Sequence, residues 1–299
     1  MALKLKHVVV ALKPETAEKY VKEGYIPIET SYGTRSVTDA FRLDHHGELS
    51  GLVNPAKRAR KELFCKGNGT YVVSHLDLDT VLTIAGLECI KVDPDLADVV
   101  SILDIHGPHV VEWEKTRWAP FFVAFWKIFE RIVFKDGEDV TELVEKALEL
   151  VKKAKKLERS KRLKREIWNL GSEIKKGLNE VVDVKTIEVD DPEIERVKIG
   201  LVIGGESKAG FKAYYKKADI VVAYNRQLKK ISIALKSDKF VNLFGPKGLL
   251  EIVDYLNVTY GSGWGGRETI IGSPRDKEVT EQVAREIYDY IVGYLLKQD

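Results

Sequence analysis

Short apolar runs alternate with helical patterns along the first half of the chain. Runs of strand length occur at residues 6–12, 25–30 and 70–79, and segments with helical patterns occur at 14–23 and 55–65. This alternation is typical of an α/β domain in which helices flank a mainly parallel sheet. We therefore expect an α/β fold for the first part of the chain.

The pattern changes twice further along the chain. From residue 140 the apolar positions recur at helical spacing, and after about residue 182 strand-length, β-branched runs return. Helical patterns follow near 246–256 and 279–297. We therefore expect a metal-binding domain over 1–139, a helical linker over 140–182 and a smaller α/β domain over 183–299.

The most apolar later run, residues 118–134, is interrupted by Lys127, Glu130 and Arg131. It is too short and too charged to cross a bilayer, so it predicts a buried helix. The first residues hold no long apolar run of the signal-peptide kind. We expect no membrane partner.

Composition narrows the class of protein further. A net charge of +2 is too balanced to require nucleic acid as a partner. Cys65 and Cys89 form no metal-type pair and are too few for a disulfide framework, so a reducing cytoplasm is the simplest compartment. Heavy use of Lys and Glu resembles the composition of hyperthermophile proteins.

The histidines are unevenly distributed. Five of the six lie between positions 45 and 109, in three groups that also contain aspartate. The groups are Asp44, His45 and His46; His75, Asp77 and Asp79; and Asp104, His106 and His109. Three separate segments with the same two ligand types predict convergence on one metal site.

Polar residues and leucines alternate in the segment His75-Leu-Asp-Leu-Asp79, which predicts the directions of its side chains. On an extended segment His75, Asp77 and Asp79 would point to one side and the leucines to the other. Imidazole and carboxylate ligands without thiolate suit Mn²⁺, Fe²⁺ or Zn²⁺ better than a structural zinc site built on cysteine, and Mg²⁺ is also left open. The number of ligands exceeds the needs of one ion, so two ions are an open alternative.

These residues resemble the DHH phosphoesterase superfamily, two-domain enzymes with an H-x-D-x-D segment and a D-H-H triplet around metal ions, usually Mn²⁺. His75, Asp77 and Asp79 match the first motif, and Asp44, His45 and His46 match the triplet by letter. The triplet comes first here, whereas the family order is the reverse. Asp104 and His106 are therefore the second candidate for the triplet's place.

The tail resembles the substrate domain of the same family, with a glycine-rich turn at Gly263, Gly265 and Gly266 and with Arg267 where the family often has His. Clustered glycines let backbone N–H groups approach an anion, and Arg267 and Arg275 could grip phosphate. Arg35 lies close in sequence to Asp44 and is a further substrate candidate. Trp264 could stack on a base or fill the core.

The resemblance implies a metal-dependent phosphoesterase that cleaves a phosphodiester or phosphoanhydride in a nucleotide or short oligonucleotide. A water bridging two ions would attack phosphorus, and His46 or His109 would protonate the leaving oxygen. Two alternatives remain: a nucleotide- or nucleic-acid-binding protein without turnover, and a different metal-dependent phosphohydrolase with its ligands on helices. A homodimer is left open.

Overall fold

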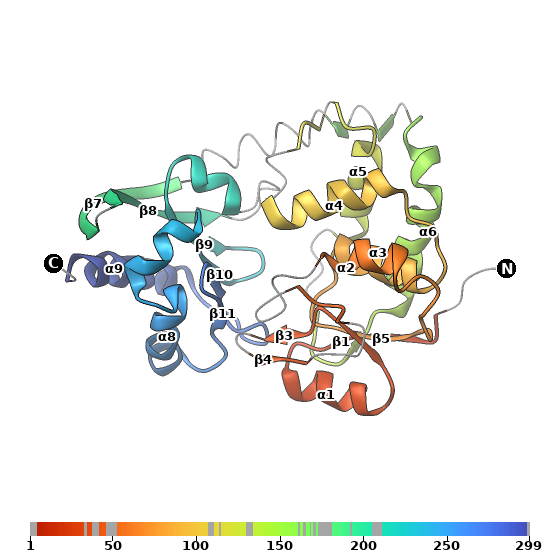
Figure 1. The fold of residues 1–299 in the computed structure, drawn as a ribbon, viewed down its shortest axis with the longest axis horizontal. Coiled ribbons are helices and arrows are strands. Elements are labelled where there is room, and N and C mark those ends of the chain that lie inside the picture. The colour runs from red at the N-terminus through yellow and green to blue at the C-terminus, as the bar shows by residue number, and fades with distance from the viewer. Residues whose placement is uncertain are drawn as a thin grey trace. The chain divides into compact units, whose positions relative to one another are not determined.

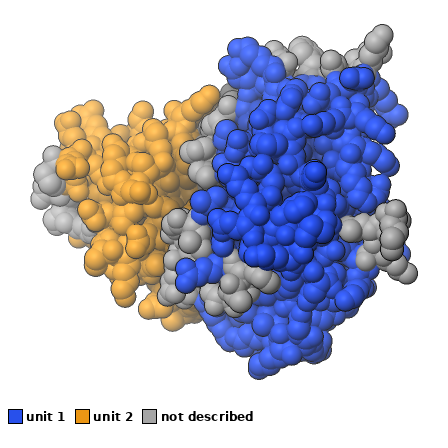
Figure 2. Space-filling view, turned by 45° about the vertical axis from the view of Figure 1, so that its right-hand side comes forward, with its two compact units in different colours: residues 1–106, 110–171 blue, residues 107–109, 172–299 orange. Residues whose placement is uncertain are grey.

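The computed structural model divides the chain into two compact units, coloured separately in Figure 2. Unit 1 comprises residues 1–106 and 110–171, and unit 2 comprises residues 107–109 and 172–299. The domain limits expected from the sequence stay predictions. The structure describes residues 5–32, 35–37, 42–45, 53–106, 111–113, 115–129, 134–160, 162, 163, 166, 167, 169, 172, 181–191, 193–204 and 211–297.

Unit 1 contains a four-stranded sheet in the order β2 (Ile26–Ile28), β5 (Thr70–Val73), β1 (His7–Val10) and β6 (Glu138–Asp139). The first three strands are parallel, and β6 pairs antiparallel with β1. The valines of β1 and the last three residues of β5 are buried, as expected for strands covered on both faces. The predicted α/β class with a mainly parallel sheet is confirmed for this part.

Helices cover this sheet. Figure 1 shows α1 (Pro14–Lys22) below it and α2 (Pro55–Lys61) and α3 (Leu78–Leu87) above it. A short hairpin of β3 (Ser31–Tyr32) and β4 (Arg35–Ser36) follows β2. Unit 1 also contains α4 (Pro94–His106), α5 (Ala119–Phe129) and α6 (Thr141–Leu157).

The apolar run from Trp118 forms α5, whose residues Ala119 to Val123 and Phe125 are buried. The prediction of a buried helix is therefore confirmed for the described part of that run. Helix α6 packs against α3, α5 and β1, so its residues belong to the core of unit 1. In the part of the chain that the structure describes, no helix combines the length and the apolarity that a membrane span requires.

Cys65 and Cys89 form a disulfide, which the sequence analysis did not predict. Cys65 follows α2 and Cys89 follows α3, and these two helices pack directly against each other. A backbone hydrogen bond joins the same two segments, because the N–H of Cys65 donates to the carbonyl of Gly86. The pairing comes from tertiary contact between two helix ends, which a count of cysteines does not show.

Unit 2 contains a six-stranded sheet in the order β11 (Gly265–Arg267), β12 (Ile270–Gly272), β10 (Lys230–Leu235), β9 (Ile220–Asn225), β8 (Ile194–Gly204) and β7 (Val181–Asp191). Strands β8 and β9 are parallel, and the other neighbouring pairs are antiparallel. The return of β-branched runs after residue 182 therefore predicted strands correctly.

Helix α9 (Glu281–Leu296) packs against β7, β8 and β9. Its residues Ile287 and Ile291 are fully buried in a core that also contains Ile199, Ile220 and Ile233 of the sheet. Other helical segments of unit 2 are η3 (Phe211–Lys216), η4 (Asp238–Phe244), η5 (Gly248–Ile252) and α8 (Val253–Tyr260). The two helical patterns expected near 246–256 and 279–297 are present.

Candidate metal centre

Glu29 directly follows β2 and has a backbone conformation that is unusual for its residue type. Its φ of 51° lies in the left-handed region, which costs a non-glycine residue about 1–3 kcal/mol. Its N–H donates to the carbonyl of Leu43 at 2.9 Å, and its own carbonyl accepts the hydroxyl of Ser74. These two hydrogen bonds stabilise the strained backbone of Glu29, and the Glu29 side chain is buried.

The Glu29 carboxylate lies between two imidazoles. Its Oε1 is 2.9 Å from Nε2 of His45, and its Oε2 is 3.0 Å from Nε2 of His75. Sequence analysis missed Glu29, although a useful pattern was present: an acidic residue directly follows a buried strand. Ile28 of β2 pairs with Val73 of β5, so the residues after them, Glu29 and Ser74, are neighbours.

Three aspartates complete the surroundings of these histidines. Asp79 Oδ2 and Asp104 Oδ2 lie 3.8 Å and 3.2 Å from Nε2 of His45. Asp77 Oδ2 lies 3.2 Å from Nε2 of His75. The structure thus brings together residues from all three of the His/Asp groups predicted from the sequence.

The residues form two overlapping ligand groups. One consists of Glu29, His45 and Asp79, and the other consists of Glu29, His75 and Asp77. Within each group the ligand atoms lie within 4.8 Å of one another. We call these the His45 group and the His75 group.

The expected extended geometry of residues 75–79 is wrong. Strand β5 ends at Val73, and α3 begins at Leu78 with Asp77 as its N-cap, because Asp77 Oδ1 accepts the N–H of Thr80 at 2.9 Å. Asp79 therefore lies in the first helical turn. The three side chains reach the same region through a strand-to-helix turn rather than by alternation along a strand.

Asp79 is the most deeply buried aspartate of the centre, with 2% of its surface exposed. No N–H or hydroxyl group of the residues that the structure describes donates a hydrogen bond to either of its carboxylate oxygens. Burial, followed by the charges of Glu29, Asp77 and Asp104, raises the pKa of Asp79 well above its ordinary value. A buried carboxylate in this state requires a proton or a cation beside it.

The neighbouring carboxylates also shift the pKa values of His45 and His75. Burial lowers the pKa of His75, but Asp77 and Glu29 outweigh it and raise that pKa to about 10. Burial also opposes protonation of His45, while Glu29 and then Asp104 and Asp44 raise its pKa overall. In the absence of a cation, protons on the imidazoles thus balance the carboxylates.

Ser74 fixes the orientation of the His75 ring. The single Ser74 hydroxyl proton is donated to the carbonyl of Glu29, and Ser74 Oγ lies 2.9 Å from His75 Nδ1. Nδ1 must therefore be the protonated nitrogen that donates to Ser74. When His75 is neutral, its Nε2 lone pair faces Glu29 and Asp77, as in a metal-binding histidine whose second nitrogen is hydrogen-bonded.

The donor set fits a divalent metal ion. A buried Glu, His and Asp supply oxygen and nitrogen donors without a thiolate, and the Asp79 carboxylate is directed into the group. The His45 group could therefore hold a divalent metal ion, and Glu29, His45 and Asp79 are its candidate ligands.

The other residues of the three His/Asp groups have different positions. Asp44 is buried and its Oδ2 accepts the hydroxyl of Ser31 at 2.6 Å, so it lies beside the centre without joining either group. His106 is the last residue of α4, and its side chain lies outside the described part of the structure. His46 and His109, expected to act on protons, also lie outside the described residues.

Arg35, expected to contact substrate, lies on β4. Its guanidinium forms ion pairs with Glu15, at 2.9 Å, and with Glu18, both on α1. About half of its side chain is exposed. Its role as a substrate contact stays a prediction.

The glycine-rich turn of unit 2 forms the hairpin of β11 and β12. A Cβ at Gly266 would lie 2.2 Å from the carbonyl oxygen of Ile270, and a Cβ at Gly263 would lie 2.9 Å from Cβ of Pro274. Both glycines also have positive φ, so the local structure alone requires them. Gly265 pairs with Gly272 in the same hairpin.

The arginines of this turn are half-buried. Arg267 lies close enough to Tyr215 to lower the pKa of its phenol, although burial dominates and raises that pKa overall. Arg267 Nε is buried without a hydrogen-bond partner among the described residues. Arg275 follows the buried Ser273, and Trp264 is only 4% exposed in the core of unit 2. Of the two roles considered for Trp264, the core position is the one observed.

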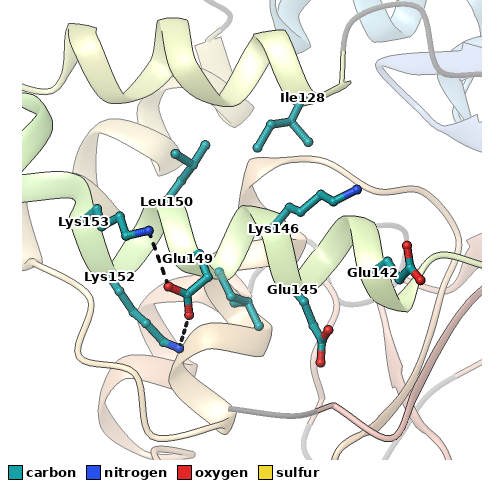
Figure 3. A pocket seen from close by; sticks show the side chains of 9 residues that line it. Ile128, Glu142, Glu145, Lys146, Glu149, Leu150, Lys152 and Lys153 are labelled. Atoms are coloured by element: carbon teal, nitrogen blue, oxygen red, sulfur yellow. Dashed lines mark hydrogen bonds and ion pairs between the residues drawn. The ribbon is translucent and has the colours of Figure 1, made fainter. Parts of the chain in front are cut away.

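A surface hollow of about 650 Å³ lies along α6. Figure 3 shows Glu149 between Lys152 and Lys153, which it contacts at 2.5 Å and 3.7 Å, with Ile128 of α5 at the opposite side. None of the residues that line it belongs to the His45 or His75 group. The hollow is therefore separate from the candidate metal centre.

Neither the models of known protein families nor the curated proteins compared with this chain match it.

Proposed function

We propose that this protein is a metal-dependent phosphoesterase that hydrolyses a phosphodiester or phosphoanhydride bond in a nucleotide or short oligonucleotide. The observation that supports this most is the buried Glu29 carboxylate between His45 and His75, with Asp79 beside it. Mn²⁺ is the proposed ion, because the DHH phosphoesterases usually use it and carboxylate donors suit it. The resemblance to the DHH phosphoesterases supports the same reaction.

The proposed chemistry divides between the ion and the side chains. A divalent ion at this position supplies a water of lowered pKa and positive charge against the phosphoryl oxygens. His45 and His75 use Nε2 toward the carboxylates, so neither can also donate a proton to a leaving group. His46 and His109 therefore stay the proposed proton donors.

Unit 2 supplies the proposed substrate contacts. Arg267 is the last residue of β11 and Arg275 follows β12, and the planar guanidinium suits bidentate recognition of phosphate. Arg35 is the proposed contact in unit 1. We also propose a cytoplasmic location, since intracellular disulfides occur in hyperthermophile proteins, whose composition this chain resembles.

The test combines elemental analysis with an activity assay. We expect purified protein to contain a divalent metal and, with added Mn²⁺, to release phosphate or mononucleotides from nucleotides and short oligonucleotides. Asp77→Ala should lose at least a hundredfold in activity. Asp98→Asn, which removes an exposed carboxylate paired with Lys57 at 2.9 Å, should retain it.

Two results would contradict the proposal. Tight oligonucleotide binding without product under any divalent ion would identify a binding protein instead. Full turnover by Asp77→Ala would exclude the assigned role of that carboxylate.

A further inference from the structure

We propose that β7, the edge strand of the sheet in unit 2, pairs antiparallel with β7 of a second copy of this chain. The pairing is centred on Val184 and joins the two six-stranded sheets into one continuous sheet. Both copies contribute the same residues, as in any interface with two-fold symmetry. The proposal is independent of the proposed function, because it uses no residue that is assigned to binding or chemistry there.

The backbone of β7 offers an edge to a further strand. In the part of the chain that the structure describes, β7 is the last strand of its sheet and pairs with β8 alone (Figure 1). It contains 11 residues, which is about twice the typical length of a strand. Alternate N–H and C=O groups of an edge strand point away from its sheet, and an added strand can pair with them. Many protein complexes form by strand addition of this kind.

The side chains of β7 divide between two faces of the sheet. Ile187 is buried in the core of unit 2, and Lys185 forms an ion pair at 3.1 Å with Asp289 of α9. Because side chains alternate along a strand, Asp183 shares this face with them and Val184 lies on the opposite face. One face therefore carries the charges beside α9, and the other carries Val184.

The regular part of β7 exposes apolar surface. Val184 has 38% of its surface exposed, and its neighbour Val182 has 52%. The pairing with β8 is regular from Asp183 to Glu188, with register shifts on either side of that segment. Edge strands are commonly protected from pairing by bulges, proline or charges, and the regular segment contains neither a bulge nor a proline. Its charges, among them Lys185, therefore decide whether it can pair.

These charges are complementary when the centre lies at Val184. A two-fold axis through the centre and perpendicular to the sheet places side chains of the same face opposite each other. Asp183 of each copy then lies opposite Lys185 of the other, and the two Val184 side chains meet. Opposite charges in this position each contribute about 0.2–1 kcal/mol. Because β7 begins at residue 181, the paired segment covers residues 181–187.

Other centres within the regular segment are less favourable. A centre at Asp183, Lys185 or Glu188 would place identical charges opposite each other, which destabilises the pairing. A centre at Thr186 or Ile187 would leave Lys185 opposite an apolar side chain instead of an acidic one. The sequence of the segment therefore selects Val184 as the centre.

The first test is a cross-link that depends on the register. Both cysteines of the chain are in the disulfide, so one added cysteine is the only free thiol. In Val184→Cys the two added residues lie opposite each other, with Cα atoms about 4.5–5.5 Å apart, which permits a disulfide. In the matched control Thr186→Cys they lie about 13 Å apart along the strands. After oxidation with diamide, we expect a covalent dimer of Val184→Cys and none of Thr186→Cys.

The second test changes the charges. The wild-type protein should be a dimer in sedimentation velocity at micromolar concentration. Asp183→Lys and Lys185→Asp each place like charges opposite each other, so each should raise the Kd of the dimer about tenfold or more. An equal mixture of these two variants should dimerise again, because every lysine then lies opposite an aspartate of the other copy.

A matched pair of valine variants completes the design. Val184→Lys places two added ammonium groups opposite each other and should abolish the dimer. Val258→Lys changes a residue of α8 that is 87% exposed and should retain it. Circular dichroism shows whether each variant folds. If a charge variant does not fold, Val184→Lys decides, because its change removes no ion pair.

Three results would overturn the proposal. A wild-type protein that stays monomeric leaves no second copy on β7. A dimer that Val184→Lys does not weaken has its interface elsewhere. Equal cross-linking of Val184→Cys and Thr186→Cys would exclude the register centred on Val184. None of the substituted residues belongs to the His45 group or the His75 group, so these results do not depend on metal binding.

Discussion

The carboxylate of Asp77 connects the start of α3 to the candidate metal centre. Its Oδ1 accepts the N–H of Thr80 at 2.9 Å, while its Oδ2 lies 3.2 Å from Nε2 of His75. Helix capping and the contact with His75 thus use different oxygens of one side chain. The two roles can be separated by substitution.

Asp77→Asn should keep the cap, because an asparagine oxygen can still accept the N–H of Thr80. Asp77→Ala removes the cap and should cost about 1 kcal/mol more in the free energy of unfolding. Both variants lose the ion pair with His75, so their difference isolates the cap. Urea unfolding in EDTA measures it, and equal stability of the two variants would contradict the capping role.

Close packing of α2 and α3 gives a second prediction. A Cβ at Gly86 would lie 2.6 Å from the carbonyl carbon and oxygen of Ala59, which are backbone atoms that cannot move independently. Gly86→Ala should therefore destabilise unit 1 by about 1–3 kcal/mol.

The control for this prediction lies in α9. Nothing lies within 4 Å of a Cβ at Gly293, so Gly293→Ala should stabilise that helix by up to about 1 kcal/mol. Thermal unfolding of both variants checks the opposite signs. A neutral Gly86→Ala would show that α2 and α3 are less closely packed.

The disulfide gives a third prediction. Cys65 and Cys89 are separated by 24 residues, and a cross-link over a loop of that length stabilises by about 3 kcal/mol through the unfolded chain. Replacing both cysteines with serine should lower the free energy of unfolding by this amount. Reductant should destabilise the wild-type protein and leave the double variant unchanged; equal effects on both would exclude the disulfide as the cause.

The fourth prediction concerns pH. His75 has a pKa raised from 6.5 to about 10, so its favourable interaction is fully present below pH 6.5 and is lost as the pH rises through 10. Asp79 has a raised pKa, which means that its ionisation in the folded protein also opposes stability at higher pH. In EDTA, the unfolding temperature should therefore fall between pH 6.5 and 9.5.

Asp79→Asn tests the same argument from the other side. Removal of this buried charge should raise the unfolding temperature of the metal-free protein at pH 8 and weaken Mn²⁺ binding at the same time. Mn²⁺ should reduce the alkaline loss in the wild-type protein, because it takes over the role of the protons. An unfolding temperature that is constant or rises with pH in EDTA would contradict these assignments.

Much of the fold could be predicted because its strands are continuous apolar runs. The valines of β1 and the β-branched residues of β8 and β9 each indicate a buried strand without tertiary information. The convergence of His45, His75 and Asp104 was predicted because each belongs to a short segment that contains both histidine and aspartate. In the structure, His75 follows β5, the parallel neighbour of β2, and Asp104 belongs to α4.

Other parts required the structure. Glu29 is a single acidic residue, and its importance depends on β2 lying beside β5, which the sequence does not specify. The alternation over 75–79 was misinterpreted, because the Asp77 carboxylate accepts the N–H of Thr80 and so caps the helix that begins at Leu78. A capping aspartate and a metal ligand look identical in a sequence.

The candidate ligands lie on segments far apart along the chain, since Glu29 directly follows β2, His45 lies between β4 and α2, and Asp104 belongs to α4. An unfolded chain cannot assemble them, so metal should bind only after β2, β5 and α4 have docked. Added Mn²⁺ then acts as a thermodynamic ligand of the native state, and the unfolding temperature should increase with the logarithm of its concentration. Bound Mn²⁺ would thus indicate that the chain has folded as well as that the ion needed for the proposed reaction is in place.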